Sequence, residues 1–595
     1  MQASARREPF SLAPILPPAL RKWAKPIEPA LQRLLITDRV LQGLDAARQS
    51  RNGAEFAHSL LAHLDIRFEV NDADLQRVPA SGAVLTVSNH PFGIVEGLVV
   101  LAAMDGVRQD ARIVANSMLG EIEELRASLI LVNPFETPGA REENYAPLRE
   151  ARGWLAQGGL LAVFPAGEVA SLNWKERAVT DPEWKTTAAR LALHAHCPVV
   201  PMYFAGSNGV PFQLAGTLHP ALRTLSLVHQ LQNLSGKTVR LRIGRPIPHS
   251  VLEGYRDPGR TTDYLRSRTY FLAHRGGPKS KTRSSLPACG STVAARCPDR
   301  HAAEIEALPA HCQIAANRDF VVYLTGPGAT PSILNEIGRC REIAFRNAGE
   351  GTGRELDLDR FDNYYQHLVL WNKTDRRLAG AYRLAVTTDV LPRHGISGLY
   401  TSTLFRFHHS FFERIGPAVE LGRSFVMPEY QKNFASLLLL WKGIMRVVER
   451  RPEAPVLFGA VSISNRYQPA SRGLLVNYLS ARASHELARY VRPRKRFRDP
   501  SVRDPNIRRI ASVAAELEDV SLSIADIEDD SKGVPVLLRQ YLKAGGRLLA
   551  FNLDPGFSDV LDALIVADLR TAPAGLLERC MGRAEARTFV DAPTP

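Results

Sequence analysis

One stretch without hydrophobic periodicity divides this chain and limits what it can fold into. Residues 275–300 are rich in Gly, Pro, Ser and basic residues, which is typical of an interdomain linker. On both sides of it, short apolar segments alternate with helical patterns, which indicates α/β layering in each half. The sequence therefore predicts two α/β domains joined by a basic linker. The boundaries that we expect are a helical segment at 1–60, a first domain at 61–274, the linker at 275–305 and a second domain at 306–595.

Hydrophobic runs in this sequence are too short to cross a membrane. The longest, Leu98–Met104 and Leu437–Trp441, fall far below the ~18–20 residues that a spanning helix needs. The N-terminal residues carry no secretory signal pattern, so we expect a cytoplasmic protein. None of the six cysteines forms a C-x-x-C pair, and we predict no metal site.

Positive charge is in excess, with 75 Lys+Arg against 61 Asp+Glu and a formal net charge of +14. Residues 489–510 contribute nine basic residues against two Asp, and because prolines interrupt this run we predict a loop. No recognition-helix, zinc-finger or RNA-binding pattern is present, so we predict no nucleic-acid partner. Acidic proteins and anionic membrane surfaces are the partners that such a charge favours.

The N-terminal segment has a helical hydrophobic pattern that allows two interpretations. Leu20, Trp23, Ile27, Leu31 and Leu34 recur at three- and four-residue spacing, with basic residues on other faces. The segment either packs on its own domain or lies as a basic amphipathic element on an anionic membrane.

A first candidate site follows a predicted strand. The segment Ser88–Gly97 leaves that strand and opens a helix, and it contains His90 and Glu96. A histidine in such a turn suits a general base, and a nearby carboxylate can hold its tautomer and stabilise the imidazolium. Alone, the histidine is more often structural than catalytic.

Two further segments favour a catalytic role for His90. Val163–Ser171 follows another apolar strand, and Cys197–Tyr203 reads as a buried strand flanked by prolines. In order, N-H-P…E, F-P-x-G-E and V-P resemble the glycerolipid (lysophosphatidate-type) acyltransferases, in particular the hemolysin-like branch, over roughly residues 60–250. The family's aspartate position holds Val95 here, and the glutamate position of its F-P-E-G motif holds Ala166.

This resemblance implies direct acyl transfer from a thioester to a lipid hydroxyl. His90 would take the hydroxyl proton with Glu96 as its carboxylate, and backbone N–H groups near Gly167 or a helix N-terminus would stabilise the oxyanion. The implied substrate-binding residues are Asn89, Phe164, Pro165, Gly167 and Glu168.

A second candidate site lies between residues 320 and 470. Glu420 and Arg423 occur in an otherwise apolar, glycine-containing segment that reads as a strand, where a charge needs a partner or a ligand. Other charged residues precede them in order: Arg341 and Glu342 before Phe345, then Asp357, Asp359 and Asp362, and then Arg383.

The ordered set R-E-x-x-F, D-x-D-x-x-D, Y-R and E-L-G-R-S resembles ornithine N-acyltransferases and, more distantly, acyl-homoserine-lactone synthases. The resemblance implies a GNAT-like mixed-sheet domain that forms an amide on an amino acid. Glu420 would polarise or deprotonate the α-amine. Arg383 and Arg423 would either hold a carboxylate or pair with Asp357, Asp359 or Asp362.

The acyl donor is suggested by a missing glycine. Acetyltransferases bind the pyrophosphate of coenzyme A with a glycine-containing loop, whereas in Gln431–Ser436 the residue at that place is Phe434. This suits acyl carrier protein, which offers only a phosphopantetheine thioester. We expect no tightly bound cofactor, and acyl-acyl carrier protein or acyl-CoA as co-substrate.

Together these patterns predict a bifunctional enzyme resembling the fused ornithine-lipid synthases. The C-terminal domain would acylate an amino acid with a 3-hydroxyacyl group, and the N-terminal domain would acylate the hydroxyl of that lyso-lipid. Acyl carrier protein and an anionic membrane are the expected partners, with a peripheral location on the inner face of a bacterial cytoplasmic membrane. The alternative is a lysophospholipid acyltransferase with a non-catalytic GNAT-like domain.

Overall fold

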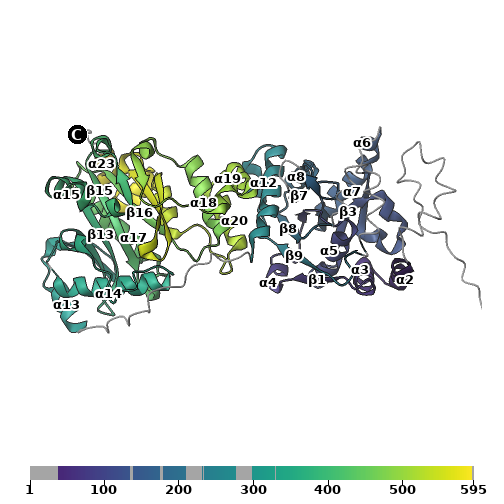
Figure 1. The fold of residues 1–595 in the computed structure, drawn as a ribbon, viewed down its shortest axis with the longest axis horizontal. Helices are drawn as coiled ribbons and strands as arrows, with labels where there is room; N and C mark the ends of the chain where they lie inside the picture. The colour runs from purple at the N-terminus through teal and green to yellow at the C-terminus, as the bar shows by residue number, and fades with distance from the viewer. Residues whose placement is uncertain are drawn as a thin grey trace, which may run out of the picture. The chain divides into compact units, whose positions relative to one another are not determined.

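A computed structural model of the chain describes residues 38–133, 139–173, 178–208, 231, 233–276, 298–328 and 330–591. Contacts divide the chain into two units (Figure 1). Unit 1 comprises Met1–Arg275 and Val513–Ile527, and unit 2 comprises Gly276–Ser512 and Glu528–Pro595. The amphipathic N-terminal segment up to residue 37 and linker residues 277–297 lie outside the described residues.

Unit 1 is built on a sheet that, within the described residues, has seven strands in the order β1-β9-β8-β2-β5-β3-β4. Only β8 and β9 pair antiparallel; the other neighbours are parallel. The central strands β2 and β5 are buried along their whole length, as expected for a parallel sheet covered on both faces. The strands are β1 (Arg67–Val70), β2 (Val84–Ser88), β3 (Ala111–Asn116), β4 (Leu129–Val132), β5 (Leu160–Val163), β8 (Val199–Ala205) and β9 (Thr238–Ile243), and a separate pair is formed by β6 (Ser171–Asn173) and β7 (Ala178–Thr180).

Helices cover both faces of this sheet. One hydrophobic core joins α3 (Gly53–His63) and α5 (Ile94–Met104) to side chains of β2, β3 and β8. A second core, on the other face, joins α7 (Tyr145–Ala156), α8 (Thr187–Ala195) and α12 (Pro258–Phe271) to β2, β5 and β8. The remaining helices in the described part of unit 1 are α2 (Asp38–Ala47), α4 (Asp72–Leu75), α6 (Ala140–Glu143), α11 (His249–Gly254) and α20 (Leu517–Ile527).

Unit 2 contains a mixed sheet with, among the described residues, eight strands in the order β10-β11-β12-β13-β15-β16-β19-β18. β15 and β16 pair in parallel, and every other neighbouring pair is antiparallel. The strands are β10 (Gln313–Ala316), β11 (Phe320–Thr325), β12 (Gln366–Asn372), β13 (Arg377–Val386), β15 (Ala418–Val426), β16 (Val456–Ile463), β18 (Arg547–Asp554) and β19 (Val560–Asp568), and β14 (Phe405–Phe407) pairs with β17 (Val491–Pro493).

The parallel pair β15/β16 separates part-way along. Its registered pairing ends at Glu420 opposite Phe458, although both strands continue. The two strands are still in close contact at Gly459: a Cβ atom at this position would lie 2.2 Å from the carbonyl oxygen of Leu421, so only glycine fits. Beyond this point β15 also carries a bulge, since the pairing with β13 shifts between Ala381 and Arg383. The sheet is therefore opened at its centre, next to an irregular strand.

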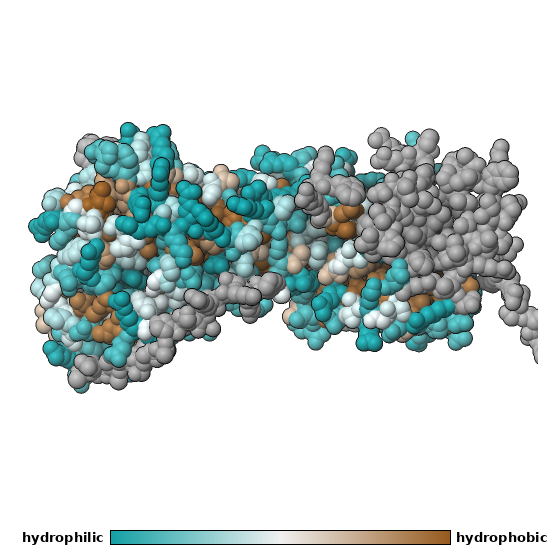
Figure 2. Space-filling view, in the orientation of Figure 1, coloured by the Kyte–Doolittle hydropathy of each residue, from teal (hydrophilic) through white to brown (hydrophobic). Residues whose placement is uncertain are grey.

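Helix α14 (Pro331–Asn347) packs on the central strands β13 and β15, and helix α17 (Phe434–Arg450) packs mainly on β10, β11 and β12. The other helices are α13 (Pro298–Glu306), α15 (Thr387–His394), α16 (Ser410–Ile415), α18 (Pro469–Arg482), α19 (Pro505–Val513), α21 (Val536–Lys543), α22 (Ala574–Met581) and α23 (Arg583–Asp591). On the face drawn in Figure 2, apolar residues of the described surface form small patches among hydrophilic ones. No helix among the described residues has both the length and the apolar character to cross a membrane.

The structure departs from the sequence prediction in three places. Helix α13 begins inside the predicted linker, at Pro298. The basic run at 489–510, predicted as a loop, contains β17 and the start of α19, because Pro505 occupies the first turn of the helix, where no backbone N–H is needed. Residues 513–527, predicted within the second domain, fold with unit 1.

Candidate active sites

The first site lies at the carboxyl end of β2. Asn89 is buried there and joins the ends of two strands, donating through Nδ2 to the Phe204 carbonyl (2.9 Å) and accepting at Oδ1 from the Phe204 N–H (2.7 Å). Its amide is thus engaged by backbone. Asn89 holds the turn that presents His90.

His90 and Glu96 are brought together by the start of α5. The Nδ1 atom of His90 lies 3.3 Å from Oε1 of Glu96, which is fully buried and also accepts the Phe92 N–H at 2.6 Å. The longer glutamate side chain therefore reaches the histidine from one position later than the family's aspartate. Burial would lower the pKa of His90, but the charge and hydrogen bond of Glu96 and the charge of Asp181 outweigh it and raise that pKa.

Asp181 is a residue of this site that sequence analysis missed. Its Oδ1 accepts the backbone N–H of His90 (3.1 Å), its Oδ2 accepts Trp184 Nε1 (2.8 Å), and burial raises its pKa. The hydroxyl of Tyr270 accepts the Asp181 N–H at 2.9 Å. The only sequence signal was an aspartate directly after a short strand, which is too common to single out a site.

The loop after β5 covers His90 from one side. The ring of Phe164 stacks on the imidazole with 4.5 Å between centroids, and the Ala170 N–H donates to the His90 carbonyl (2.8 Å). Gly167 has φ +69° and its N–H donates to the Phe164 carbonyl, closing the turn. That N–H is therefore not free for an oxyanion. Pro165 is buried in the loop, whereas Glu168 is exposed.

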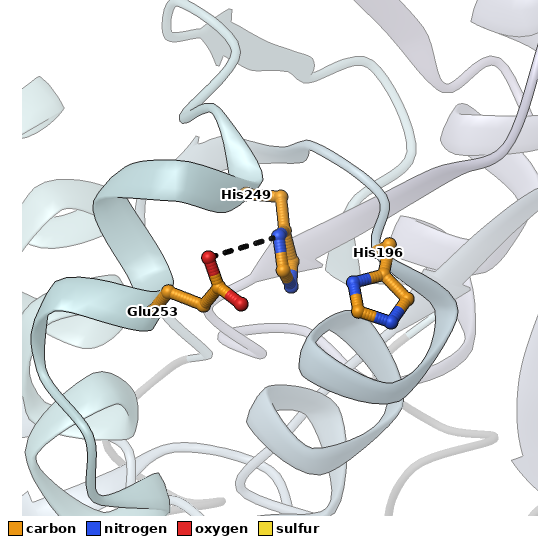
Figure 3. A group of neighbouring side chains, drawn as sticks. All are labelled: His196, His249 and Glu253. Atoms are coloured by element: carbon orange, nitrogen blue, oxygen red, sulfur yellow. Dashed lines mark ion pairs between the residues drawn. The ribbon is translucent and has the colours of Figure 1, made fainter.

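A group of three side chains that could hold a metal ion lies in the same unit (Figure 3). One ligand atom from each of His196, His249 and Glu253 falls within 4.8 Å of the others, and His249 Nδ1 lies 3.8 Å from Glu253 Oε2. His196 precedes β8, whereas His90 follows β2, and these strands are parallel. The group is thus at the opposite strand ends from His90 and takes no part in that site.

In unit 2, Glu420 is enclosed by donors. Its side chain is 1% exposed and accepts the Tyr365 hydroxyl, the Tyr400 N–H (3.1 Å) and the Thr401 N–H (2.7 Å). Burial raises the pKa of Glu420 despite these hydrogen bonds. Its carboxylate ties β15 to the segment at 400–401.

A buried ion-pair network holds the other predicted charges. Arg383 Nη1 contacts Asp359 (2.6 Å) and Asp362 (3.1 Å), and Arg341 also pairs with Asp362 (3.3 Å). His367 lies 3.7 Å from Asp362, and burial with the two arginine charges lowers its pKa to about 4. Arg383 and Asp362 are almost completely buried, so removing either partner would leave an uncompensated charge inside unit 2.

A pocket opens where β15 and β16 separate. Arg423, the last of the predicted arginines, lines it and lies 3.5 Å from Asp357. Sequence analysis missed Asp562 on β19, which also lines the pocket, because β19 was not predicted as a strand. Glu420 is not among the lining residues. These are Phe345, Tyr382, Tyr400, Leu421, Gly422, Arg423, Ser424, Ala460, Ser462, Leu537, Tyr541, Phe557 and Asp562.

Two family models match parts of this chain. Residues 47–276 match the family model described as "Acyltransferase", and residues 340–442 match the "Acetyltransferase (GNAT) domain". The first match contains His90 and Glu96, and the second contains Arg383, Glu420 and Arg423.

Three curated relatives fall into two groups. A glycine N(alpha)-acyltransferase of Phocaeicola vulgatus is 35% identical over 27% of this chain and 52% of its own length. A lyso-glycine lipid O-acyltransferase of the same organism is 27% identical over 38% of this chain and 81% of its own. An L-ornithine N(alpha)-acyltransferase of Agrobacterium fabrum is 28% identical over 23% of this chain and 47% of its own. The chain thus spans about half the length of the curated N-acyltransferases it matches.

Proposed function

Because this chain combines an acyltransferase domain with a GNAT domain, we propose that it makes an acylated amino-acid lipid in two steps. Unit 2 transfers a 3-hydroxyacyl group to the α-amine of an amino acid, and unit 1 acylates the hydroxyl of the resulting lyso-lipid. The observation that carries the proposal is that one chain resembles both an amino-acid N-acyltransferase and a lyso-lipid O-acyltransferase.

The His90–Glu96 pair supports the second step. With Nδ1 directed to Glu96, the other ring nitrogen can take the acceptor hydroxyl proton while the alkoxide attacks the thioester carbonyl. Glu96 stabilises the imidazolium that forms, and the leaving thiolate then takes the proton from the imidazolium of His90. No acyl-enzyme is needed for this sequence of events.

The start of α17 supports acyl carrier protein as the donor for unit 2. Two N–H groups of its first turn are bonded within the chain: Asn433 Oδ1 accepts from Ala435 (3.0 Å), and the Asn433 carbonyl accepts from Ser436 (3.1 Å). Phe434, 68% exposed, stands at the first helical position. N–H groups that are already bonded offer little to a pyrophosphate, so we propose a phosphopantetheine thioester rather than coenzyme A.

A basic surface supports acidic partners. All nine basic side chains of residues 489–509 are exposed, namely Arg489, Arg492, Arg494, Lys495, Arg496, Arg498, Arg503, Arg508 and Arg509. Acyl carrier proteins and anionic lipid surfaces both present negative charge. We propose that the protein works peripherally at the inner face of a bacterial cytoplasmic membrane.

Lipid mass spectrometry of an expressing strain tests the proposal. In a host without aminolipids, the intact protein should produce a diacylated aminolipid based on glycine or ornithine. His90→Gln should stop synthesis at the monoacylated lyso-lipid, whereas His58→Gln, an exposed histidine of the same unit, should leave the diacylated product unchanged. An expressing strain with no new aminolipid would overturn the proposal.

A lysophospholipid acyltransferase is the competing function. Purified protein would then acylate lysophosphatidate, and amino acids added with a 3-hydroxyacyl thioester would remain unmodified. Measuring both acceptors side by side separates the two functions, because only the proposed enzyme consumes an amino acid.

A further inference from the structure

The pocket in unit 2 contains a buried carboxylate without a cation. Asp562 is 5% exposed and lines the pocket from β19. It accepts one long hydrogen bond, 3.4 Å from Asn552 Nδ2, and no Arg, Lys or His nitrogen among the described residues forms an ion pair with it. A buried carboxylate of this kind either takes up a proton or obtains its missing positive charge from a ligand.

A strained arginine faces the same pocket. Arg423 has φ +49°, a left-handed conformation that non-glycine residues rarely adopt, and it lies in the β15 bulge opposite Tyr382. The bulge brings four consecutive residues, 421–424, to the pocket lining. Bulges next to active sites re-aim side chains in this way, and strain at one residue is retained where function requires it.

The guanidinium of Arg423 has donors to spare. Within the described part of the chain its buried Nε has no hydrogen-bond partner, and its contact with Asp357 is a loose 3.5 Å. The rings of Tyr400 and Phe557 pack on it, with their centroids 5.1 and 4.6 Å from Arg423 Cζ, and hold it in place. A carboxylate entering the pocket would find a positioned, incompletely satisfied cation.

We propose that this pocket binds the amino acid that is acylated, with its α-ammonium at Asp562 and its α-carboxylate at Arg423, and that Asp562 takes the proton that makes the amine nucleophilic. The proposal rests on the N-acyl transfer proposed above and gives that reaction a base other than Glu420. An amino acid is the ligand class that presents both charges across a single carbon atom.

The reaction balances with these groups. Asp562 takes one proton from the ammonium, and the free amine attacks the thioester carbonyl. The C–N bond forms, the C–S bond breaks, and the leaving thiolate takes the second proton from nitrogen. Asp562 then returns its proton to solvent, so one amide, one thiol and one proton are produced.

The electrostatic surroundings of Asp562 fit an amine partner. Burial first, and then the charges of Asp554 and Glu350, raise the pKa of Asp562 well above its usual range, while Asn552 and Arg423 act in the opposite direction. A raised pKa brings the carboxylate closer to that of an amine, which favours proton exchange between them. Ser462, the cross-strand neighbour of Asp562, donates to Glu350 (2.8 Å), whose pKa burial raises to about 7.

Substitution of Asp562 tests its role. Asp562→Asn keeps the shape and should lower kcat/KM for N-acylation of glycine or ornithine by about 10²–10⁴-fold, the usual effect of losing a general base. Asp568→Asn, on the same strand but away from the pocket, should retain the wild-type rate. Circular dichroism of both variants checks that the fold is intact.

Substitution of Arg423 tests the other half of the site. The wild-type enzyme should prefer glycine to glycinamide, because only glycine offers a carboxylate. Arg423→Gln should raise the KM for glycine by about 10- to 100-fold, the usual value of a charge-assisted contact, and should erase the preference. A positional role in folding alone would not change the ratio between these two acceptors.

The outcomes separate this inference from the proposed function. If wild-type protein acylates neither amino acid, the proposed function fails. If wild-type protein is active and Asp562→Asn keeps the wild-type kcat/KM, or if Arg423→Gln keeps the preference for glycine, the amino-acid site is elsewhere and the inference fails while the function stands.

Discussion

At the scale of single residues, His90 is set up by two carboxylates with different tasks. Glu96 faces the ring nitrogen Nδ1, whereas Asp181 holds the backbone N–H of the same residue. Both charges favour the imidazolium, so the pKa of His90 is raised although burial opposes this. The base form of His90 is therefore present above that raised pKa and is lost as pH falls through it.

This arrangement predicts the pH dependence of O-acyl transfer. Glu96→Gln removes the nearer negative charge, so the pKa of His90 should fall and the acid limb of the pH profile should move to lower pH. The plateau rate should also fall, by up to about 10⁴-fold, the cost of losing the carboxylate in a Ser-His-Asp triad. Profiles of kcat/KM between pH 5 and 9 with a lyso-lipid acceptor provide the measurement.

Glu69→Gln is the matched control, since Glu69 is exposed on β1 of the same unit and pairs with Arg240 at the surface. Its profile should overlay that of the wild type. An acid limb that stays in place in Glu96→Gln would contradict the role of Glu96 in setting the pKa of His90.

At the scale of elements, the sequence predicts those strands that carry a continuous hydrophobic run. The strands predicted before Ser88–Gly97, before Val163–Ser171 and within Cys197–Tyr203 are observed as β2, β5 and β8, because each has a clear apolar run. The edge strands β1 and β10 were missed, since half-exposed strands lack such runs. The pocket could not be predicted either, because no hydrophobic run reveals the separation of β15 from β16, the bulge in β15 or the approach of β19.

The orientation of Glu420 on β15 leads to a stability prediction. Glu420→Gln would place an NH2 group among three donors, so a buried hydrogen bond is lost without replacement. We expect unit 2 to lose about 1–3 kcal/mol of stability. Amide hydrogen exchange of β15 in the full-length protein measures this loss.

Residual N-acylation by Glu420→Gln is informative as well. If Asp562 is the base, the folded fraction of the variant should keep much of its activity. Glu429→Gln, an exposed residue after the same strand, should change neither exchange nor activity. Wild-type hydrogen exchange in Glu420→Gln would contradict the structural role.

At the scale of the whole molecule, the two units do not follow the order of the chain. The linker composition predicts a single division near residue 275, yet Val513–Ile527 folds with unit 1. The segment is held by polar contacts that no hydrophobic pattern reveals: Asp519 accepts Tyr255 and Tyr264, and Asp526 pairs with Arg268 at 2.5 Å. A domain boundary predicted from composition alone cannot detect that a segment of the second half folds with the first unit.

The activity of the first domain should therefore depend on Asp526, although this residue comes late in the sequence. Arg268 and Asp526 are each 1% exposed, and Asp526 Oδ1 also accepts the Arg245 N–H (2.8 Å). Asp526→Ala leaves a buried arginine unpaired, which costs about 3–5 kcal/mol. We expect unit 1 to unfold at lower temperature and the lyso-lipid to accumulate, while N-acylation by unit 2 continues. Asp530→Ala, a solvent-exposed neighbour paired with Lys532, should leave both steps intact. Equal loss of the two activities in Asp526→Ala would mean that the segment supports unit 2 as much as unit 1.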